Sequence, residues 1–277
     1  MRVHVRFATT FSLSIFGLLL LVAGTASAAP AIGWKEADKG LHVAEVQTVL
    51  NGDRYAITLV KIDPGAYSFQ LLCATEHGKE PLSVKEWAIK HHLVAAVNAS
   101  MFQADGLTSI DFMKNFGHVN NPRLSRDNTI LAFNPVDKNL PQVQLIDREC
   151  QDFSDLRSKY RSFVQGIRMI SCNGRNVWSR QDAKWSMLAM GMDARGNILF
   201  LFCRTPGSVH DFIEILLSLP LSLKSAMYLE GGPQASLYLS TPKITLEKYC
   251  TLGGLESDSI KFALPIPNVI GIAKKNR

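Results

Sequence analysis

Alternating apolar and polar residues predict three β-strands early in the chain, at Leu41–Leu50, Tyr55–Ile62 and Tyr67–Cys73. The sequences between them, Asn51-Gly52-Asp53 and Asp63-Pro64-Gly65, are typical of tight turns. Because strands joined by short turns usually pair with their chain neighbours, we expect an antiparallel meander here.

Two helices are predicted by their capping sequences. Residues 83–86 have the form of a capping box, which opens a helix that ends near His91. Ser208, with Asp211 in the reciprocal position of a second capping box, predicts a helix that runs to Leu219. Apolar residues at helical spacing place one face of this second helix against a sheet.

The remaining pattern predicts mostly strands. The polar segment 151–160 is compatible with a short helix, and the stretch from Gln103 to Arg126 is expected to be irregular. We therefore interpret the fold as α+β, a single domain of mixed, largely antiparallel β-sheet with a few flanking helices. The further strands are expected at Leu93–Val97, Thr129–Asn134, Gln142–Asp147, Phe163–Ser171, Leu188–Met192, Asn197–Arg204, Ala226–Leu229, Ile260–Leu264 and Asn268–Ala273.

The N-terminus has the pattern of a secretory signal peptide. Two arginines precede an apolar run at Phe11–Val22, and the small residues Ala26-Ser27-Ala28 follow it. We expect a signal peptide over 1–28, a single domain over 29–277, and a secreted or periplasmic protein. An uncleaved N-terminal anchor is the alternative, although the apolar run is short for a membrane span.

Charge excludes some partners. The formal net charge is +6, and signal cleavage removes two of these charges with Arg2 and Arg6. The sequence has no block of Lys and Arg and no interleaved aromatic stripe, so nucleic acid is not expected as a partner. No stable membrane insertion is expected after cleavage, no cofactor is implied, and no oligomeric state is indicated.

The cysteine pattern favours one disulfide. The five cysteines are Cys73, Cys150, Cys172, Cys203 and Cys250, so at least one is free or pairs between chains. Cys150 and Cys172 flank a polar segment and form the pair we favour. Cys203 lies within an apolar strand and is interpreted as a core residue. No Cys-x-x-Cys or His-x-x-x-His spacing suggests zinc, and no metal is expected.

The stretch Ser225–Leu239 contains the main candidate site in this sequence. A short buried strand leads into Glu230, and Gly231 and Gly232 follow. The strand fixes the carboxylate, and the glycines allow backbone N–H groups to approach a ligand without an intervening Cβ. The alternative interpretation is an ordinary turn built on Gly-Gly-Pro.

Four short motifs follow one another along the chain, and their order resembles that of the phosphodiester glycosidase family. The resemblance covers roughly Val94 to Leu239 and is strongest from Met187 onward. The motifs are Asn98-Ala99-Ser100-Met101-Phe102, Gln165-Gly166-Ile167-Arg168-Met169-Ile170, Met187-Leu188-Ala189-Met190-Gly191 and Leu229-Glu230-Gly231-Gly232-Pro233.

The resemblance implies a glycosidase site with Glu230 and Asn98 as catalytic residues. The chain is also similar to the family at Gln165 and Phe102. Ser236 is the hydroxyl residue nearest in sequence to the glycine motif. The substrate-binding residues that we expect are Gly231, Gly232, Arg204, Gln165, Phe102 and Ser236.

The chain departs from the family pattern at two chemically important positions. Met187 stands where the family has an arginine, the natural bidentate clamp for a phosphate. Glu230 stands where the family has an aspartate, so its carboxylate lies one methylene further out. Arg204, at the end of a core strand, is our candidate for the missing cation, with Arg168 as its rival.

Two hypotheses remain open from the sequence. The first is a secreted hydrolase that cleaves a glycosyl-1-phosphodiester or related envelope saccharide. One carboxylate suffices for such a substrate, since a phosphate monoester departs without a strong proton donor. The second is a catalytically inactive relative that binds a saccharide or an envelope partner, which the loss of arginine at Met187 favours.

Overall fold

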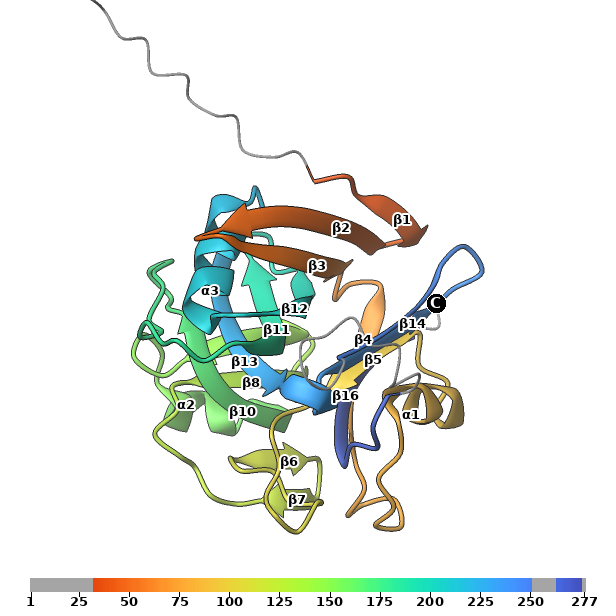
Figure 1. Ribbon diagram of the computed structural model, residues 1–277. Coiled ribbons are helices and arrows are strands. Elements are labelled where there is room, and N and C mark those ends of the chain that lie inside the picture. Colours follow the sequence, from red (N-terminus) through yellow and green to blue (C-terminus); the bar gives the residue numbers. More distant parts are fainter. Residues whose placement is uncertain (1–31, 251–262, 276–277) are drawn as a thin grey trace, which may run out of the picture.

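Two antiparallel β-sheets packed face to face form the body of this protein, as a computed structural model shows (Figure 1). The structure describes residues 32–250 and 263–275. The predicted signal peptide and most of the predicted strand Ile260–Leu264 lie outside these ranges. None of the described helices is long and apolar enough to cross a membrane.

The described residues form sixteen strands, three α-helices and one short 3₁₀ helix. Sheet dominates over helix, so the fold is richer in strand than the α+β class that we predicted. The elements are β1 (Lys35–Asp38), β2 (Leu41–Leu50), β3 (Asp53–Ile62), β4 (Tyr67–Cys73), α1 (Val84–Lys90), β5 (Ala95–Asn98), β6 (Met113–Asn115), β7 (His118–Asn121), β8 (Thr129–Pro135), β9 (Val143–Asp147), α2 (Phe153–Arg157), β10 (Tyr160–Ile170), β11 (Trp185–Asp193), β12 (Ile198–Gly207), α3 (Val209–Ser218), β13 (Leu223–Gly231), η1 (Gly232–Gln234), β14 (Ser236–Ser240), β15 (Thr245–Tyr249) and β16 (Asn268–Lys274).

The larger sheet has eleven strands in the order β1-β2-β3-β12-β11-β13-β10-β6-β7, with β8 paired to β10 and β9 paired to β8. The smaller sheet has five, in the order β15-β14-β5-β16-β4. Every strand pair within the described residues is antiparallel, so the parallel pairing implied by a mixed sheet is not found there.

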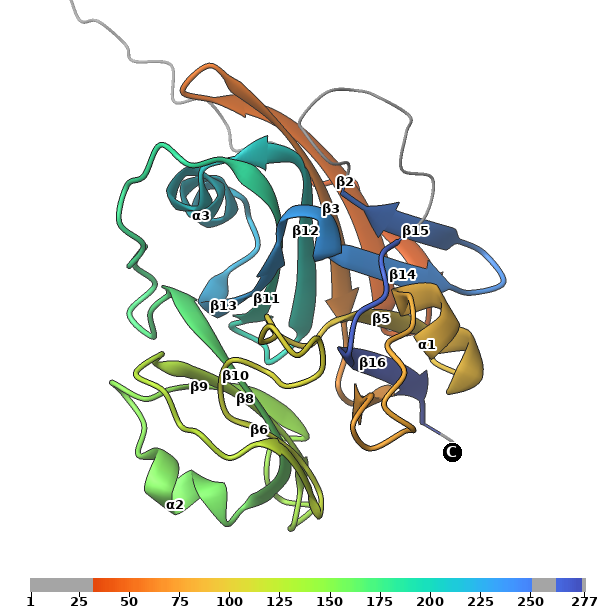
Figure 2. The same cartoon turned by 60° about the horizontal axis from the view of Figure 1, so that its bottom comes forward.

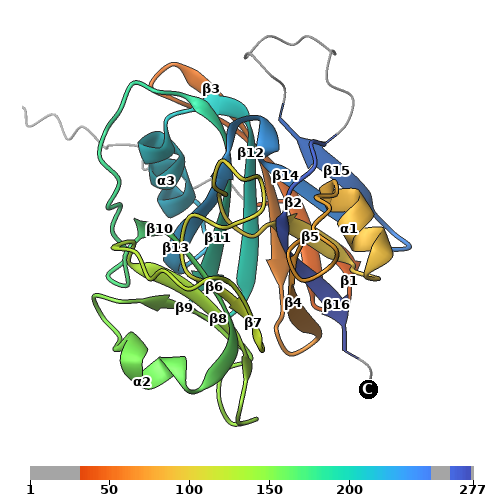
Figure 3. The same ribbon diagram turned by 90° about the horizontal axis from the view of Figure 1, so that it is seen from below.

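The main hydrophobic core lies between the two sheets. Leu188 and Phe202 of the large sheet pack in it with Val97 and Leu237 of the small sheet. A second cluster fills the space between the large sheet and α3, and a third lies between the small sheet and α1. Figures 2 and 3 show the two helices on opposite outer sides of the sandwich.

Local sequence signals predict most of these elements. The capping box of α1 is formed, because Ser83 and Glu86 bond each other's backbone. The predicted box of α3 is not formed: the Ser208 side chain makes no capping bond, and Asp211 instead accepts a hydrogen bond from Asn51 Nδ2 at 3.1 Å. The helix itself is present, because its buried apolar face packs against the sheet.

The predicted meander is only partly correct. β2 and β3 pair as expected, but β4 joins the smaller sheet, beside β16. The turn at Asp63-Pro64-Gly65 therefore carries the chain from one sheet to the other. Two strands of the smaller sheet, β14 and β15, were not predicted from the sequence.

Candidate active site

Glu230 lies near the end of β13, a strand in the middle of the larger sheet. β13 pairs with β11 on one edge and with β10 on the other. The register with β11 shifts just after the pair of Glu230 with Leu188, and such a bulge redirects the side chains beside it. The two neighbouring strands therefore fix the position of this carboxyl group.

The Glu230 carboxyl is buried with little to compensate its charge. Only 7% of the residue is exposed, and Oε1 accepts one hydrogen bond, from Gly231 N at 2.9 Å. Burial raises the pKa of Glu230 from 4.5 to about 7, although the bond from Gly231 acts in the opposite direction. A carboxyl group with this pKa exchanges protons near neutral pH, as a general acid or base must.

The charges of Arg204 and Glu230 both influence the buried thiol of Cys250. Burial raises the pKa of this thiol to about 12; a hydrogen bond with Ser186 and the charge of Arg204 lower this pKa, and the charge of Glu230 raises it. Arg204 itself is exposed near the end of β12. Our preferred cation therefore lies on the surface, and its charge reaches the same thiol as that of Glu230.

The two positions after Glu230 favour glycine for different physical reasons. A Cβ on Gly231 would overlap the Tyr228 hydroxyl and lie 2.8 Å from Trp185 Cδ1. Gly232 has a φ of 65°, in the left-handed region, and nothing lies within 4 Å of its missing Cβ. The backbone therefore presents open space at Gly232 and close aromatic packing at Gly231.

The aromatic residues around Gly231 were not predicted as part of the site. The Tyr228 ring packs against Trp178 with centroids 5.5 Å apart, and both tryptophans are half-buried. The Trp185 Nε1 donor is buried without a hydrogen-bond partner among the described residues. The available signal in the sequence was weak: Trp178 and Trp185 flank a polar segment before a buried strand.

Asn98 fastens the loop that follows Glu230. Its Oδ1 accepts hydrogen bonds from Ser236 N at 2.9 Å and Ser236 Oγ at 3.3 Å, and its Nδ2 donates to Gln234 O at 3.0 Å. Only 1% of Asn98 and 1% of Ser236 is exposed. These contacts assign both residues to the framework of the glycine loop.

Gln165 is fully occupied by the neighbouring loop. Oε1 accepts from the backbone N–H groups of Phe112 and Ser125, and Nε2 donates to the carbonyls of Ser125 and Asp127. Phe102 forms a bridge with Ser109 and is half-buried. The Gln165 side chain is therefore used within the fold, where it holds the segments around Phe112 and Ser125 together.

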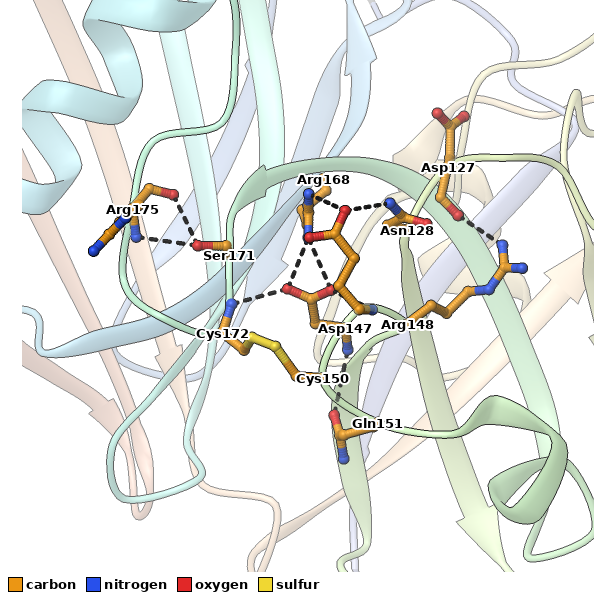
Figure 4. A network of polar contacts seen from close by, with 11 residues as sticks. Asp127, Asn128, Asp147, Arg148, Cys150, Gln151, Arg168, Ser171, Cys172 and Arg175 are labelled. Carbon is orange, nitrogen blue, oxygen red and sulfur yellow. Dashed lines mark hydrogen bonds and ion pairs between the residues drawn. A yellow bond between two sulfur atoms is a disulfide. The ribbon is translucent and has the colours of Figure 1, made fainter.

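Arg168, the rival cation, belongs to a separate network (Figure 4). Its Nη1 lies 3.1 Å from Asp147 Oδ1 and 2.6 Å from Glu149 Oε2. The nearby cysteines, Cys150 and Cys172, form the predicted disulfide. Because its charge is already paired, Arg168 is poorly placed to bind a phosphate.

Met187 is buried in the cluster beneath α3. It is fully inaccessible and pairs across the sheet with Cys203 and Gly231. Cys203 is also buried there, as predicted. Met187, which our sequence comparison sets at the arginine position, is thus an apolar side chain that packs against apolar neighbours.

Three surface cavities lie elsewhere. One of about 250 Å³ lies beside Trp34 and Arg195, one of about 480 Å³ beside Arg148 and one of about 540 Å³ beside Arg180. None of these three is lined by Glu230. The candidate site is defined by its buried carboxyl and by the open space at Gly232.

The two-sheet fold thus holds one buried carboxyl, with its pKa raised to about 7, directly before a Gly-Gly turn. The chain belongs to the phosphodiester glycosidase family, whose model matches residues 91–273. This match extends beyond the region over which the motifs resemble the family. A comparison with curated proteins gives no match.

Solved structures share the fold at low sequence identity. The catalytic domain of zebrafish N-acetylglucosamine-1-phosphodiester alpha-N-acetylglucosaminidase, auto-inhibited by its pro-peptide, has a TM-score of 0.60 and 12% identity, over 91% of this chain and 86% of that one. A hypothetical protein from Synechocystis has a TM-score of 0.60 and 16% identity, over 89% of this chain and 64% of that one. A putative exported protein from Burkholderia pseudomallei has a TM-score of 0.52 and 11% identity, over 79% of this chain and 74% of that one.

Proposed function

We propose that this protein is a secreted or periplasmic glycosidase that cleaves a glycosyl-1-phosphodiester or a related envelope saccharide. Membership of the phosphodiester glycosidase family supports the reaction class. The observation that carries the proposal is Glu230, a residue only 7% exposed, whose carboxyl pKa is raised to about 7 beside an open backbone turn. A fold without a use for this carboxyl has no reason to bury it.

In this mechanism Glu230 acts at the anomeric centre as the acid/base or the nucleophile. The phosphate monoester that departs needs little protonation, because its remaining ionisation has a pKa near 6. One carboxyl group therefore supports the reaction where ordinary glycosides require two.

The other residues position the substrate. The N–H group of Gly232, on the open side of the turn, approaches the sugar or its phosphate, while the N–H of Gly231 holds the Glu230 carboxyl in position. Arg204 supplies the positive charge for the phosphate. Asn98 and Ser236 hold the glycine loop, whereas the side chain of Gln165 bonds the segment 112–127 and Phe102 bridges to Ser109. We assign Asn98 to positioning, since its amide already bonds the loop.

The test is hydrolysis of a panel of chromogenic glycosides and sugar-1-phosphodiesters by the mature protein. Glu230→Gln keeps the shape of the side chain and removes its ionisation, and Glu230→Asp restores the family residue. Glu149→Gln is the matched control, because Glu149 is a carboxylate in the Arg168 network. We expect turnover by the wild type and Glu149→Gln and its loss in Glu230→Gln, with unfolding curves showing that all variants are folded.

Burial of Met187 favours a second candidate function, a saccharide-binding protein without catalysis. No arginine stands at this position to clamp a phosphate, and its surroundings beneath α3 are apolar. This candidate predicts that glycan fragments bind the folded protein, measured by calorimetry, while the whole panel remains uncleaved. Turnover that depends on Glu230 eliminates it.

A further inference from the structure

A group of metal-ligating side chains lies on strands other than the one that carries Glu230. Cys73 ends β4, Glu76 lies in the turn that follows, and His118 begins β7. One ligand atom from each of these three residues lies within 4.8 Å of the other two. Figure 1 shows β7 beside the segment that leaves β4. Thiol, carboxylate and imidazole thus converge from segments more than 40 positions apart.

A second sulfur borders the same group. Cys73 Sγ lies 3.7 Å from Met113 Sδ, and both side chains are fully buried. A metal bound tetrahedrally at about 2.3 Å from each of two sulfurs separates them by about 3.8 Å. The observed 3.7 Å between the two sulfur atoms is close to this separation.

Hydrogen bonds hold the two polar ligands in position. His118 Nε2 lies 2.9 Å from Thr75 Oγ1, which accepts a hydrogen bond from Asn120 Nδ2 at 3.0 Å. Glu76 Oε2 accepts a hydrogen bond from Asn115 Nδ2 at 3.0 Å. Partners of this kind orient metal ligands in proteins and are part of a built site.

The exposure of the ligands provides a path for an ion. Cys73 is buried, His118 is half-buried and Glu76 is exposed, so the group opens to solvent on the carboxylate side. A cysteine binds a metal ion as the thiolate, so the thiol proton of Cys73 leaves when an ion binds.

We propose that Cys73, Glu76 and His118, with Met113 as an additional sulfur ligand, form a binding site for a thiophilic metal ion. The combination of thiolate, thioether and imidazole selects zinc or monovalent copper over magnesium or calcium. The carboxylate gives Zn²⁺ a hard fourth ligand, whereas Cu⁺ is satisfied by the two sulfurs and the imidazole. This site is independent of the proposed glycosidase activity.

The test begins with Co²⁺ added to chelator-treated full-length protein. Thiolate coordination produces a sulfur-to-cobalt charge-transfer band, which we expect in the wild type and in Cys203→Ser. Cys203→Ser is the matched control, because Cys203 is also a free, buried cysteine but lies outside the group. The band is expected to disappear in Cys73→Ser. Its absence from the wild type, or its persistence in Cys73→Ser, overturns the proposal.

Affinities from competition with chromophoric chelators then identify the ion. Stronger binding of Zn²⁺ assigns the site to zinc, and stronger binding of Cu⁺ assigns it to copper; both outcomes support the site. Because Cys73→Ser alters the core, Glu76→Gln and His118→Ala provide a second test at more exposed positions. We expect each to weaken Zn²⁺ binding at least tenfold, and unchanged affinity in both folded variants contradicts the proposal.

Discussion

Asp147 and Glu230 are both buried carboxyl residues, with 1% and 7% exposure, but their surroundings are opposite. Asp147 pairs with Arg168 at 3.1 Å and accepts backbone hydrogen bonds from Cys172 at 2.9 Å and Glu149 at 3.0 Å (Figure 4). Glu230 accepts one bond, from the residue that follows it.

The difference separates a carboxylate that serves the fold from one that is available to a ligand. The contacts of Asp147 tie β9 to β10 and to the disulfide segment, so its charge is fully used within the protein. Among residues 32–250 and 263–275, Glu230 has no comparable partners, and burial without them raises its pKa. Each prediction below changes one side of this comparison.

The largest expected effect on stability comes from Asp147, the carboxylate whose charge is paired. Asp147→Asn leaves Arg168 without its buried partner, and removing one member of a buried ion pair typically costs about 3–5 kcal/mol. Chemical denaturation measures the loss. Glu149→Gln, whose side chain is 56% exposed, is the control and is expected to cost less than about 1 kcal/mol. Equal losses in the two variants would mean that burial does not distinguish these partners.

At Glu230, the carboxyl group with few partners, removal of the charge is expected to stabilise the protein. The folded-state pKa of Glu230 lies above the unfolded value of 4.5, so the folded state favours the protonated acid and loses stability as pH rises from 4.5 to about 7. The loss amounts to about 3 kcal/mol. Glu230→Gln lacks this dependence.

Unfolding curves at several pH values test this sign. Above pH 7 the Glu230→Gln variant is expected to be more stable than the wild type by most of that amount, and below pH 4.5 the two proteins are expected to converge. A difference that does not change with pH would show that the effect comes from packing and not from ionisation.

The two glycines provide a smaller test of the space near Glu230. Gly231→Ala introduces a Cβ against Tyr228 and Trp185, and overpacking of this kind costs about 1–3 kcal/mol. Gly232→Asn introduces a residue that tolerates positive φ, and its Cβ meets no neighbour. We therefore expect this variant to lose less than about 1 kcal/mol of unfolding free energy. Tryptophan fluorescence follows the displacement of Trp185. Equal losses would contradict the distinction between packing and conformation.

Local sequence signals were sufficient for much of the fold and for the position of Glu230 near the end of a buried strand. Alternation gave β2 and β3, the capping box gave α1, and a buried strand before Gly-Gly pointed to the carboxyl. The role of Asn98 was not visible, because its partner Ser236 lies 138 positions away. The capping box of α3 failed because Asn51, from a distant turn, bonds Asp211 instead.

The metal-ligating group shows the same limit of sequence reasoning. Cys73 and His118 have no characteristic spacing, and only the packing of β7 beside the end of β4 brings them together. The partial burial of Trp178 and Trp185 around Gly231 likewise depends on how the segment before β11 lies against β13. Sequence motifs identify residues whose chemistry is local, and tertiary contacts determine which of them have partners.

The smallest expected change in stability comes from the arginine on the Glu230 side. Arg204 is exposed and makes no ion pair within the described residues, so Arg204→Gln is expected to change the free energy of unfolding by no more than about 0.5 kcal/mol. Arg168→Gln, its counterpart in the Asp147 network, is expected to be clearly destabilising, because it leaves Asp147 buried and unpaired.

Function is expected to reverse this order. If Arg204 binds the phosphate, Arg204→Gln raises KM for a sugar-1-phosphodiester and leaves KM for a neutral glycoside unchanged, whereas folded Arg168→Gln leaves both unchanged. Steady-state kinetics on the two substrate classes measures the difference. An equal change for charged and neutral substrates would remove Arg204 from phosphate recognition. A selective loss would show that the charge which the fold leaves unpaired is the one that the substrate uses.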